Sequence, residues 1–293
     1  MIQLGYYKAP RGNFGDDLNP WLWPRLLPGK INTSSDTVLI GIGSILDHRF
    51  DSFTRKIVLG AGARGPQSVP SLDDTWTVLA VRGPLTAAAL GLPSELAITD
   101  PAILVRRWVA SVPGSREIGV VPYYKSAEAW RAVCASCGYR FIHPSLPVEE
   151  FLEAIRGCGR VLCESLHGAI VADALGIPWS ALRCLNQRLE GDTHVFKWQD
   201  WCGSLGLEFH ALELPPLWDL DQPKLLPAVR QRVKVELIAH LLKRQVARGS
   251  FQRSSTEIVE HRIAQLLSAV DTIRDDSFGS SMRPLVGPAE RGS

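Results

Sequence analysis

The chain lacks the features that would place it in a membrane, outside the cell or on nucleic acid. No apolar run reaches the about 18 residues that a membrane-spanning helix needs. Residues 1–8 read as the start of a strand, not as the charged and then apolar start of a secretory signal. The formal net charge is only +2, so no overall field attracts nucleic acid. We therefore expect a cytoplasmic protein with no nucleic-acid partner.

Common cofactor and metal motifs are absent too. None of the glycine-rich turns fits the six-residue dinucleotide fingerprint or the phosphate loop that ends in Gly-Lys-Ser/Thr. Cys134 and Cys137 have the spacing of half a zinc site or of a redox pair, but they lie in a helical stretch without a second pair. The 6 cysteines mostly lie in apolar runs and are expected to be reduced, partly buried thiols. We expect no metal and no cofactor.

The composition is that of a folded globular protein, and the pattern of predicted elements indicates the α/β class. With 293 residues, 45% hydrophobic and 21% charged, the chain forms one large domain or two of ordinary size. Strand-like segments followed by glycine-rich turns and helices indicate parallel strands joined by crossovers. The pattern occurs twice without a sequence repeat, which predicts two Rossmann-like domains facing a cleft. We place these domains at residues 1–110 and 115–215, C-terminal helices at 216–272 and a disordered tail at 273–293.

Residues 161–179 form the stretch around which the chain is organised. They predict a buried strand, a tight turn with Glu164, Ser165 and His167, and a helix that Gly176 and Pro178 end. Backbone N–H groups and the helix dipole favour an anion such as phosphate at a helix start. Ligands of open α/β sheets bind just beyond strand ends. The alternative is a capping turn in which the histidine merely packs.

Three more turns should face the same cleft, at residues 13–17, 60–63 and 82–84. Together with the histidine turn they offer glycine backbone, a cation, carboxylates and an imidazole. This chemistry suits a small, highly charged phosphate ester, although it does not say which one.

A basic amphipathic helix is predicted at residues 224–248. Apolar residues recur every three to four positions and predict one apolar face, made of Leu226, Val229, Val233, Leu237 and Leu241. Glu236 is the only acid among many lysines and arginines. The simpler interpretation is a helix packed on a domain surface. The alternative is contact with an anionic membrane surface.

Five motifs, in this order, resemble the polysaccharide pyruvyl transferase family. They are Asn-x-Gly-Asp at 13–16, Gly-x-Gly-Ser at 41–44, Val-Arg-Gly-Pro-Leu-Thr at 81–86, Ile-Thr-Asp-Pro-Ala at 98–102 and Ser-Leu-His-Gly-Ala-Ile-Val-Ala-Asp-Ala-Leu-Gly-Ile-Pro at 165–178. The likeness covers residues 1–205 and is closest to bacterial exopolysaccharide ketal pyruvyltransferases of the succinoglycan and xanthan type. It implies a fold like that of the GT-B glycosyltransferases, phosphoenolpyruvate as the donor and a cyclic pyruvate ketal on a sugar as the product.

The resemblance also implies roles for individual residues. Arg82 would hold the donor's carboxylate or phosphate, and His167 would bind phosphate and protonate the leaving group. An acid and a base are needed, and the candidates are Glu164, Asp16 and Asp17. The further donor-binding candidates are Ser165, Gly168, Lys197 and Gly62, and the acceptor-binding candidates are Asn13, Trp21, Tyr123 and Lys125.

The chain departs from the family at Ser165, where many members have arginine two residues before the histidine. Another cation must then replace it, and Lys125, Arg183 and Lys197 are the candidates.

Structural alternatives stay open for several sites. Arg82 would form a domain-bridging salt bridge, Asp16 and Asp17 would be turn and cap residues, and Lys197 would be a surface lysine.

The function that we expect is transfer of the pyruvyl group of phosphoenolpyruvate onto two hydroxyls of a sugar in a lipid-linked exopolysaccharide repeat unit, with release of phosphate. The basic helix would then face the inner leaflet of the plasma membrane. One alternative is a glycosyltransferase of the same fold that uses a nucleotide sugar, with Glu190 or Asp192 holding the ribose. Another is a phosphate-ester or glycan-binding protein without turnover.

Overall fold

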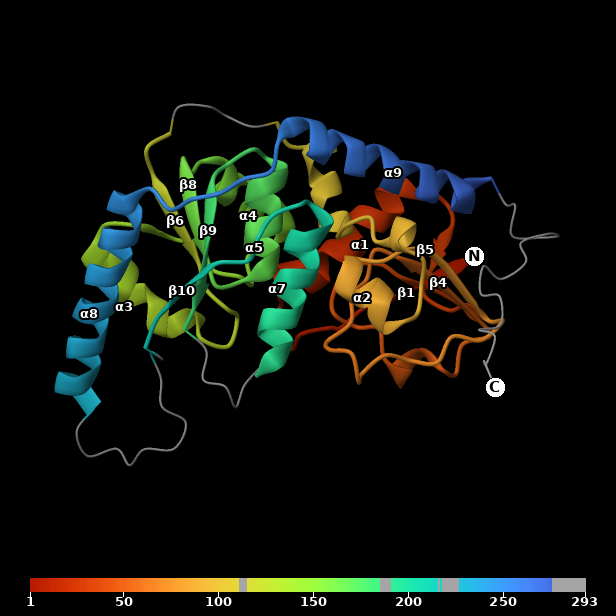
Figure 1. Ribbon diagram of the computed structural model, residues 1–293, viewed down its shortest axis with the longest axis horizontal. Helices are drawn as coiled ribbons and strands as arrows, with labels where there is room; N and C mark the ends of the chain where they lie inside the picture. Colours follow the sequence, from red (N-terminus) through yellow and green to blue (C-terminus); the bar gives the residue numbers. More distant parts are fainter. Residues whose placement is uncertain (111–114, 185–190, 216, 218–226, 276–293) are drawn as a thin grey trace, which may run out of the picture.

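The computed structural model describes residues 1–110, 115–184, 191–215, 217 and 227–275 (Figure 1). For residues 227–231 it describes the backbone only. It contains two five-stranded sheets in which every neighbouring pair of strands is parallel. Helices pack against both sheets, so the prediction of two Rossmann-like α/β domains is confirmed. The closer likeness to GT-B enzymes stays a prediction. Residues 111–114, between the two predicted domains, and residues 276–293 of the predicted tail lie outside the described residues.

The first sheet has the strand order β2-β1-β3-β4-β5. Its strands are β1 (Ile2–Gly5), β2 (Ile31–Asn32), β3 (Thr37–Ile40), β4 (Arg55–Leu59) and β5 (Trp76–Ala80). The helical segments of this half are α1 (Phe14–Leu26), α2 (Pro84–Ala89) and the 3-10 turns η1 (His48–Phe50), η2 (Ser94–Leu96) and η3 (Pro101–Arg107).

Helix α1 begins six residues earlier than its prolines suggest. The sequence predicts a helix from Pro20 onward, but α1 already starts at Phe14 and contains Pro20 and Pro24. A proline inside a helix leaves the carbonyl four residues earlier without its N–H donor. Here the side-chain amide of Asn19 donates to the Asp16 carbonyl at 3.1 Å. This bond replaces the missing one and lets the helix carry the 13–17 turn as its first turn.

The second sheet has the order β10-β9-β8-β6-β7. Its strands are β6 (Ile118–Val121), β7 (Arg140–Phe141), β8 (Arg160–Cys163), β9 (Trp179–Arg183) and β10 (Ala211–Glu213). The helices around it are α3 (Ala127–Cys137), α4 (Val148–Arg156), α5 (Leu166–Ala174) and α7 (Asp192–Ser204). The predicted strand, turn and helix at residues 161–179 are therefore β8, the His167 turn and α5.

Helix α8 (Pro227–Arg248) packs beside α3 on the second domain (Figure 1). Among its described side chains the buried ones are Val235, Ile238, Ala239 and Leu242, whereas Val233 and Leu237 are 63% and 46% exposed. The packed face is thus rotated from the predicted one, because Val233 and Leu237 were expected on it. Within the described residues, no helix is both long and apolar enough to cross a bilayer.

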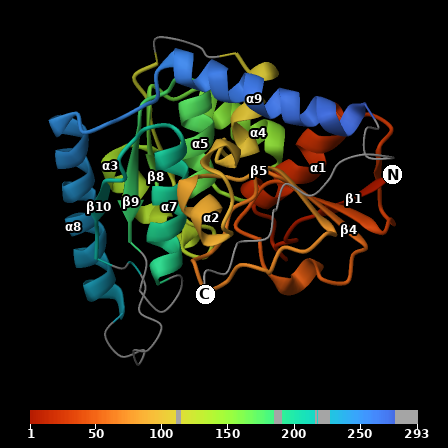
Figure 2. The ribbon, with the colours of Figure 1, turned by 45° about the vertical axis from the view of Figure 1, so that its right-hand side comes forward.

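The last helix, α9 (Thr256–Arg274), returns to the first domain, as both ribbon views show (Figures 1 and 2). It contacts η3, β4 and β5. Near its end, Arg274 Nε donates to the Leu26 carbonyl at 2.8 Å. The domains also share an apolar core, in which Phe14 of α1 stacks on Phe151 of α4 with ring centroids 3.9 Å apart. Side chains from the two domains are therefore held in fixed relation to each other.

Candidate active site

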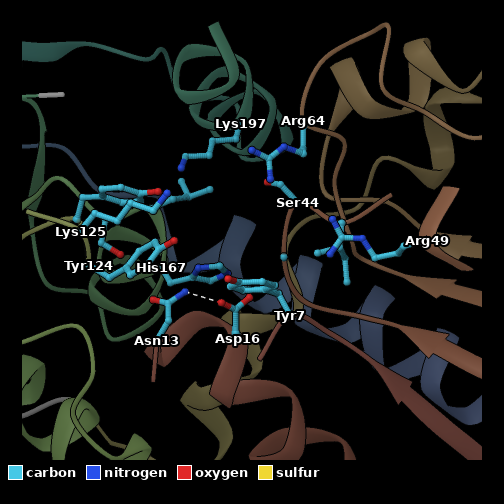
Figure 3. Close-up of a pocket in the computed structure, with 15 residues that line it drawn as sticks. Tyr7, Asn13, Asp16, Ser44, Arg49, Arg64, Tyr124, Lys125, His167 and Lys197 are labelled. Carbon is cyan, nitrogen blue, oxygen red and sulfur yellow. Dashed lines mark hydrogen bonds between the residues drawn. The ribbon is translucent and has the colours of Figure 1, made fainter. Parts of the chain in front are cut away.

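A cavity of about 360 Å³ lies between the two domains, where strand ends of both sheets meet (Figure 3). The turns after β1, β3 and β4 line it from the first domain. The turns after β6 and β8, together with α7, line it from the second. Its polar and aromatic lining residues are Tyr7, Asn13, Asp16, Ser44, Arg49, Arg64, Tyr123, Tyr124, Lys125, Ser165, His167 and Lys197.

His167 lies in the first turn of α5 and is held between groups from the first domain. Its ring rests on the backbone of Gly15, where an added Cβ would come within 2.1 Å of His167 Nδ1. Its Nε2 lies 3.6 Å from Oδ2 of Asp100, whose side chain is only 1% exposed. Among the described residues neither atom has a hydrogen-bond partner. Only a glycine at position 15 lets the ring take this position.

Asp100 is fixed independently of His167. Its other oxygen, Oδ1, accepts a hydrogen bond from the Ala102 backbone N–H at 3.0 Å and so caps η3. One carboxylate oxygen is therefore used by the fold, and the other faces the imidazole. Asp100 was not predicted as a site residue from the sequence, although the Ile-Thr-Asp-Pro-Ala motif contains it.

Asp16 is the carboxylate that lines the cavity. It is 8% exposed, and Asn13 Nδ2 donates to it at 2.7 Å. Burial raises the pKa of the Asp16 carboxyl, while the Asn13 hydrogen bond and the nearby His167 oppose the rise. Asp17, in contrast, accepts a hydrogen bond from the Asn13 backbone N–H at 3.0 Å and does not line the cavity. Of the two, Asp16 takes the candidate acid role and Asp17 stabilises the turn.

Four cations surround the cavity opposite His167 and Asp16 (Figure 3): Arg49, Arg64, Lys125 and Lys197. The Arg49 guanidinium is held by Asp47 through bonds of 2.7 and 2.6 Å. The two lysine ammonium groups each lie 5.6 Å from a tyrosine ring centroid, Lys125 from Tyr124 and Lys197 from Tyr123. These positive charges make the cavity suitable for an anion with two acidic groups.

The two arginines were not found from the sequence. They follow the β3 and β4 strand ends, and that position was the available signal. Arg183, in contrast, was a candidate replacement for the family arginine. It pairs with Glu213 at 3.2 Å and does not line the cavity.

Arg82 does not reach the cavity, contrary to the role that the resemblance implies. Its side chain is 1% exposed, and Nε lies 2.9 Å from Oδ2 of Asp200 on α7. Its Nη1 donates to Ser44 Oγ at 2.6 Å and its Nη2 to the Ala63 carbonyl at 3.0 Å. Gly62 lies directly against the guanidinium, with no room for a Cβ. The alternative interpretation, a buried ion pair between α7 and the first domain, describes what these residues do.

Glu164, a candidate acid or base from the sequence, does not line the cavity either. It is 1% exposed and outside the cavity lining. Its Oε2 accepts hydrogen bonds from the Tyr123 backbone at 2.8 Å, Ser126 Oγ at 2.7 Å and Trp130 Nε1 at 2.9 Å. These bonds hold the turn that carries Tyr124 and Lys125. Glu164 is thus a positioning residue for that turn.

The remaining predicted residues divide between the cavity and its support. Asn13, Tyr123, Lys125, Ser165 and Lys197 line the cavity. Gly168 instead packs on Val121, which lies 2.8 Å from where a Cβ would be. Trp21 lies elsewhere on α1, where its indole N–H donates to Glu149 and Arg25 lies over its ring.

No trio of His, Cys, Asp or Glu side chains in the described part of the chain is arranged to hold a metal ion. The Cys134 and Cys137 pair on α3 is a pair of free thiols. Burial raises the pKa of Cys134 to about 12 and that of Cys137 to about 11. Thiols that stay protonated are poor metal ligands and poor nucleophiles.

A cationic cavity between two α/β domains, with a histidine between carboxylates, is a site of the kind that transferases use. Comparison with known proteins identifies the class: the chain belongs to the polysaccharide pyruvyl transferase family, whose model matches residues 5–184. It is 38% identical over 221 residues to the succinoglycan biosynthesis protein ExoV of Rhizobium meliloti (strain 1021), across 72% of this chain and 67% of that protein. The resemblance seen in the sequence is confirmed, and the protein is a pyruvyltransferase.

Proposed function

We propose that the enzyme transfers the pyruvyl group of phosphoenolpyruvate to two hydroxyls of one sugar, which forms a cyclic ketal and releases phosphate. The observation that carries the proposal is the single cavity that brings four cations together with His167 and Asp16. Phosphoenolpyruvate carries a phosphate and a carboxylate close together, and such a ligand needs several fixed positive charges.

The donor would be held by cations of both domains. Arg64 and Arg49 belong to the first domain, and Lys125 and Lys197 belong to the second. Together they would replace the arginine that many relatives carry two residues before the histidine, where this chain has Ser165. Arg49 keeps its orientation through Asp47, which favours it for a planar carboxylate.

Proton transfer is assigned to Asp16 and His167. Asp16, whose pKa is raised by burial, gives a proton to the methylene carbon of the donor, which leaves a cationic centre on the neighbouring carbon. A sugar hydroxyl attacks that carbon and gives its proton to Nδ1 of His167. The carbon–oxygen bond to phosphate then breaks, and His167 protonates the leaving phosphate. A second hydroxyl closes the ring and returns a proton to Asp16.

Asp100 acts through His167. An Nε2–H directed at the Asp100 carboxylate leaves Nδ1 as the nitrogen that accepts a proton, and the carboxylate stabilises the imidazolium that forms. The two groups belong to different domains, so the site is complete only when the domains pack together.

The acceptor would be a sugar of a lipid-linked exopolysaccharide repeat unit, and the reaction would take place in the cytoplasm. The support is the likeness to ExoV, whose name assigns it to succinoglycan biosynthesis. Contact of α8 with the inner leaflet belongs to the same proposal. Arg232, Lys243, Arg244 and Arg248 are exposed on this helix together with Val233 and Leu237.

The test is thermal stability and phosphate release with phosphoenolpyruvate, compared with nucleotide sugars. A ligand at about 100 times its dissociation constant adds roughly 2.7 kcal/mol of stability. We expect a shift with phosphoenolpyruvate that Arg64→Ala and His167→Ala reduce. Arg156→Ala is the matched control, because Arg156 pairs with Glu153 on the surface of α4. A shift with a nucleotide sugar alone would replace the donor assignment by the glycosyltransferase alternative.

The nucleotide-sugar alternative has less support in the structure. Its proposed ribose ligand Asp192 is exposed at the start of α7 and does not line the cavity. Its other candidate, Glu190, lies outside the described residues. Phosphate release that depends on His167 would exclude the other alternative, a binding protein without turnover.

A further inference from the structure

A second and larger cavity adjoins the catalytic one. Its volume is about 760 Å³, and Tyr124 and Lys125 line both cavities. The rest of its wall comes from the turn at residues 9–11 after β1, from Ser126 and the first turn of α3 after β6, and from His143 and Ser145 after β7. The second cavity is therefore also built at strand ends of both domains, and a ligand in one cavity lies beside the mouth of the other.

We propose that this second cavity binds the saccharide chain of the acceptor next to the sugar that receives pyruvate. The inference rests on the proposed function, which does not say where the rest of the acceptor chain binds, and it assigns that site. The catalytic cavity of about 360 Å³ must hold the donor together with the reacting sugar. The neighbouring sugars of an oligosaccharide need a place that continues from it. The shared wall at Tyr124 and Lys125 provides that continuity.

The lining has the mixture of surfaces that a sugar chain uses. Ala9, Pro10 and Ala127 give apolar walls, and the half-buried ring of Tyr124 gives a flat face for the C–H groups of a pyranose. At the other wall, Arg11 is exposed and forms no ion pair with any described residue. It is a donor available for ring hydroxyls.

His143 and Glu128 form a polar pair on the same wall, and Arg131 Nε also donates to Glu128 Oε2 at 2.8 Å. The Ser145 backbone N–H donates to His143 Nδ1 at 3.1 Å, so neutral His143 carries its proton on Nε2. That nitrogen lies 3.4 Å from Glu128 Oε1. Because the cavity contains a carboxylate as well as cations, it suits a neutral polyhydroxylated chain better than a second anionic ligand.

The test compares short and long acceptors with the complete enzyme. The probes are fragments of depyruvylated succinoglycan, and phosphate release from phosphoenolpyruvate is measured as each fragment is varied. Ala9→Trp fills the second cavity, and Arg11→Ala removes a donor from it. Ala88→Trp is the matched control, because Ala88 is an exposed alanine on α2 that lines neither cavity.

We expect Ala9→Trp to raise the KM for long fragments at least about tenfold, with a small effect on the shortest active fragment. The thermal shift caused by phosphoenolpyruvate should not change. Equal KM values for Ala9→Trp and wild type on long fragments would overturn the second site while leaving the donor assignment intact. No turnover and no phosphoenolpyruvate shift in the wild type would overturn the proposed function itself.

Discussion

Replacing Asp100 by Asn tests the catalytic arrangement most directly. The side chain keeps its shape, and its Oδ1 still accepts the Ala102 N–H bond that caps η3. What changes is the atom that faces His167 Nε2, 3.6 Å away. An amide group there donates and carries no charge, so it favours the imidazole tautomer with the proton on Nδ1. That tautomer has no basic nitrogen for the sugar hydroxyl.

The expected loss follows from the distance. Two unit charges at 3.6 Å interact by about 4–5 kcal/mol at an effective dielectric constant of about 20. Roughly half of this survives as a net effect on the transition state, and about 1.4 kcal/mol corresponds to a factor of ten in rate. We therefore expect kcat to fall about 10²-fold. The KM for phosphoenolpyruvate should change little, because the donor is held by the four cations.

The assay is initial phosphate release at saturating acceptor, combined with ¹⁵N NMR of His167 to identify the protonated nitrogen. Asp173→Asn is the matched control. Asp173 is also a buried carboxylate, and it accepts hydrogen bonds from Trp179 Nε1 at 2.9 Å and the Ser254 backbone at 2.8 Å, outside the cavity lining. A kcat for Asp100→Asn within threefold of the control, or an unchanged tautomer, would refute the orienting role.

Three further outcomes follow from the same geometry. Gly15→Ala should abolish turnover while the protein still folds, as circular dichroism would show, because its Cβ would come within 2.1 Å of His167 Nδ1. Arg82→Ala should lower the free energy of unfolding by about 3–5 kcal/mol, because it leaves the buried Asp200 carboxylate without its ion-pair partner. Denaturant titration measures this free energy. A change confined to the KM for the donor would contradict the structural role of Arg82. Asp16→Asn should inactivate the enzyme yet raise its Tm above that of wild type at mildly alkaline pH. The raised pKa means that the folded wild type binds the Asp16 proton more tightly than the unfolded state does. Wild type therefore loses stability as the pH rises from 3.8 through the raised pKa. The Tm difference between the variant and wild type should vanish at more acidic pH, where Asp16 is protonated.

The fold was predictable because its signals are local. Strand-like segments ending in glycine turns gave the α/β class and the strand, turn and helix around His167, since side-chain periodicity and turn chemistry act over a few residues. The start of α1 was misplaced. The hydrogen bond that Pro20 cannot donate to the Asp16 carbonyl is replaced by one from the Asn19 amide, a contact that depends on the folded helix.

The site was predictable only in part, for a related reason. Residues in the turns after the strands, such as Asn13, Asp16 and His167, were placed at the cavity correctly. Arg82 and Glu164 lie in equally suggestive turns, but each is turned inward to partners far away in sequence: Arg82 meets Asp200, and Glu164 meets Trp130. A sequence shows that a charged residue follows a strand. It does not show whether that residue faces a ligand or a partner from another element.

The return of α9 to the first domain gives the two halves of the enzyme a second covalent connection. The chain passes from one domain to the other after η3, and it passes back between α8 and α9, where Gln252 pairs with Trp179 of β9. Two chain crossings restrict the relative motion of the two domains more than a single crossing would. Since Asp16 and Asp100 lie on one body and His167 on the other, the two crossings and the shared apolar core together keep the acid and the base at a fixed separation. The C-terminal helix is thus part of the alignment of a reaction centre that it never touches.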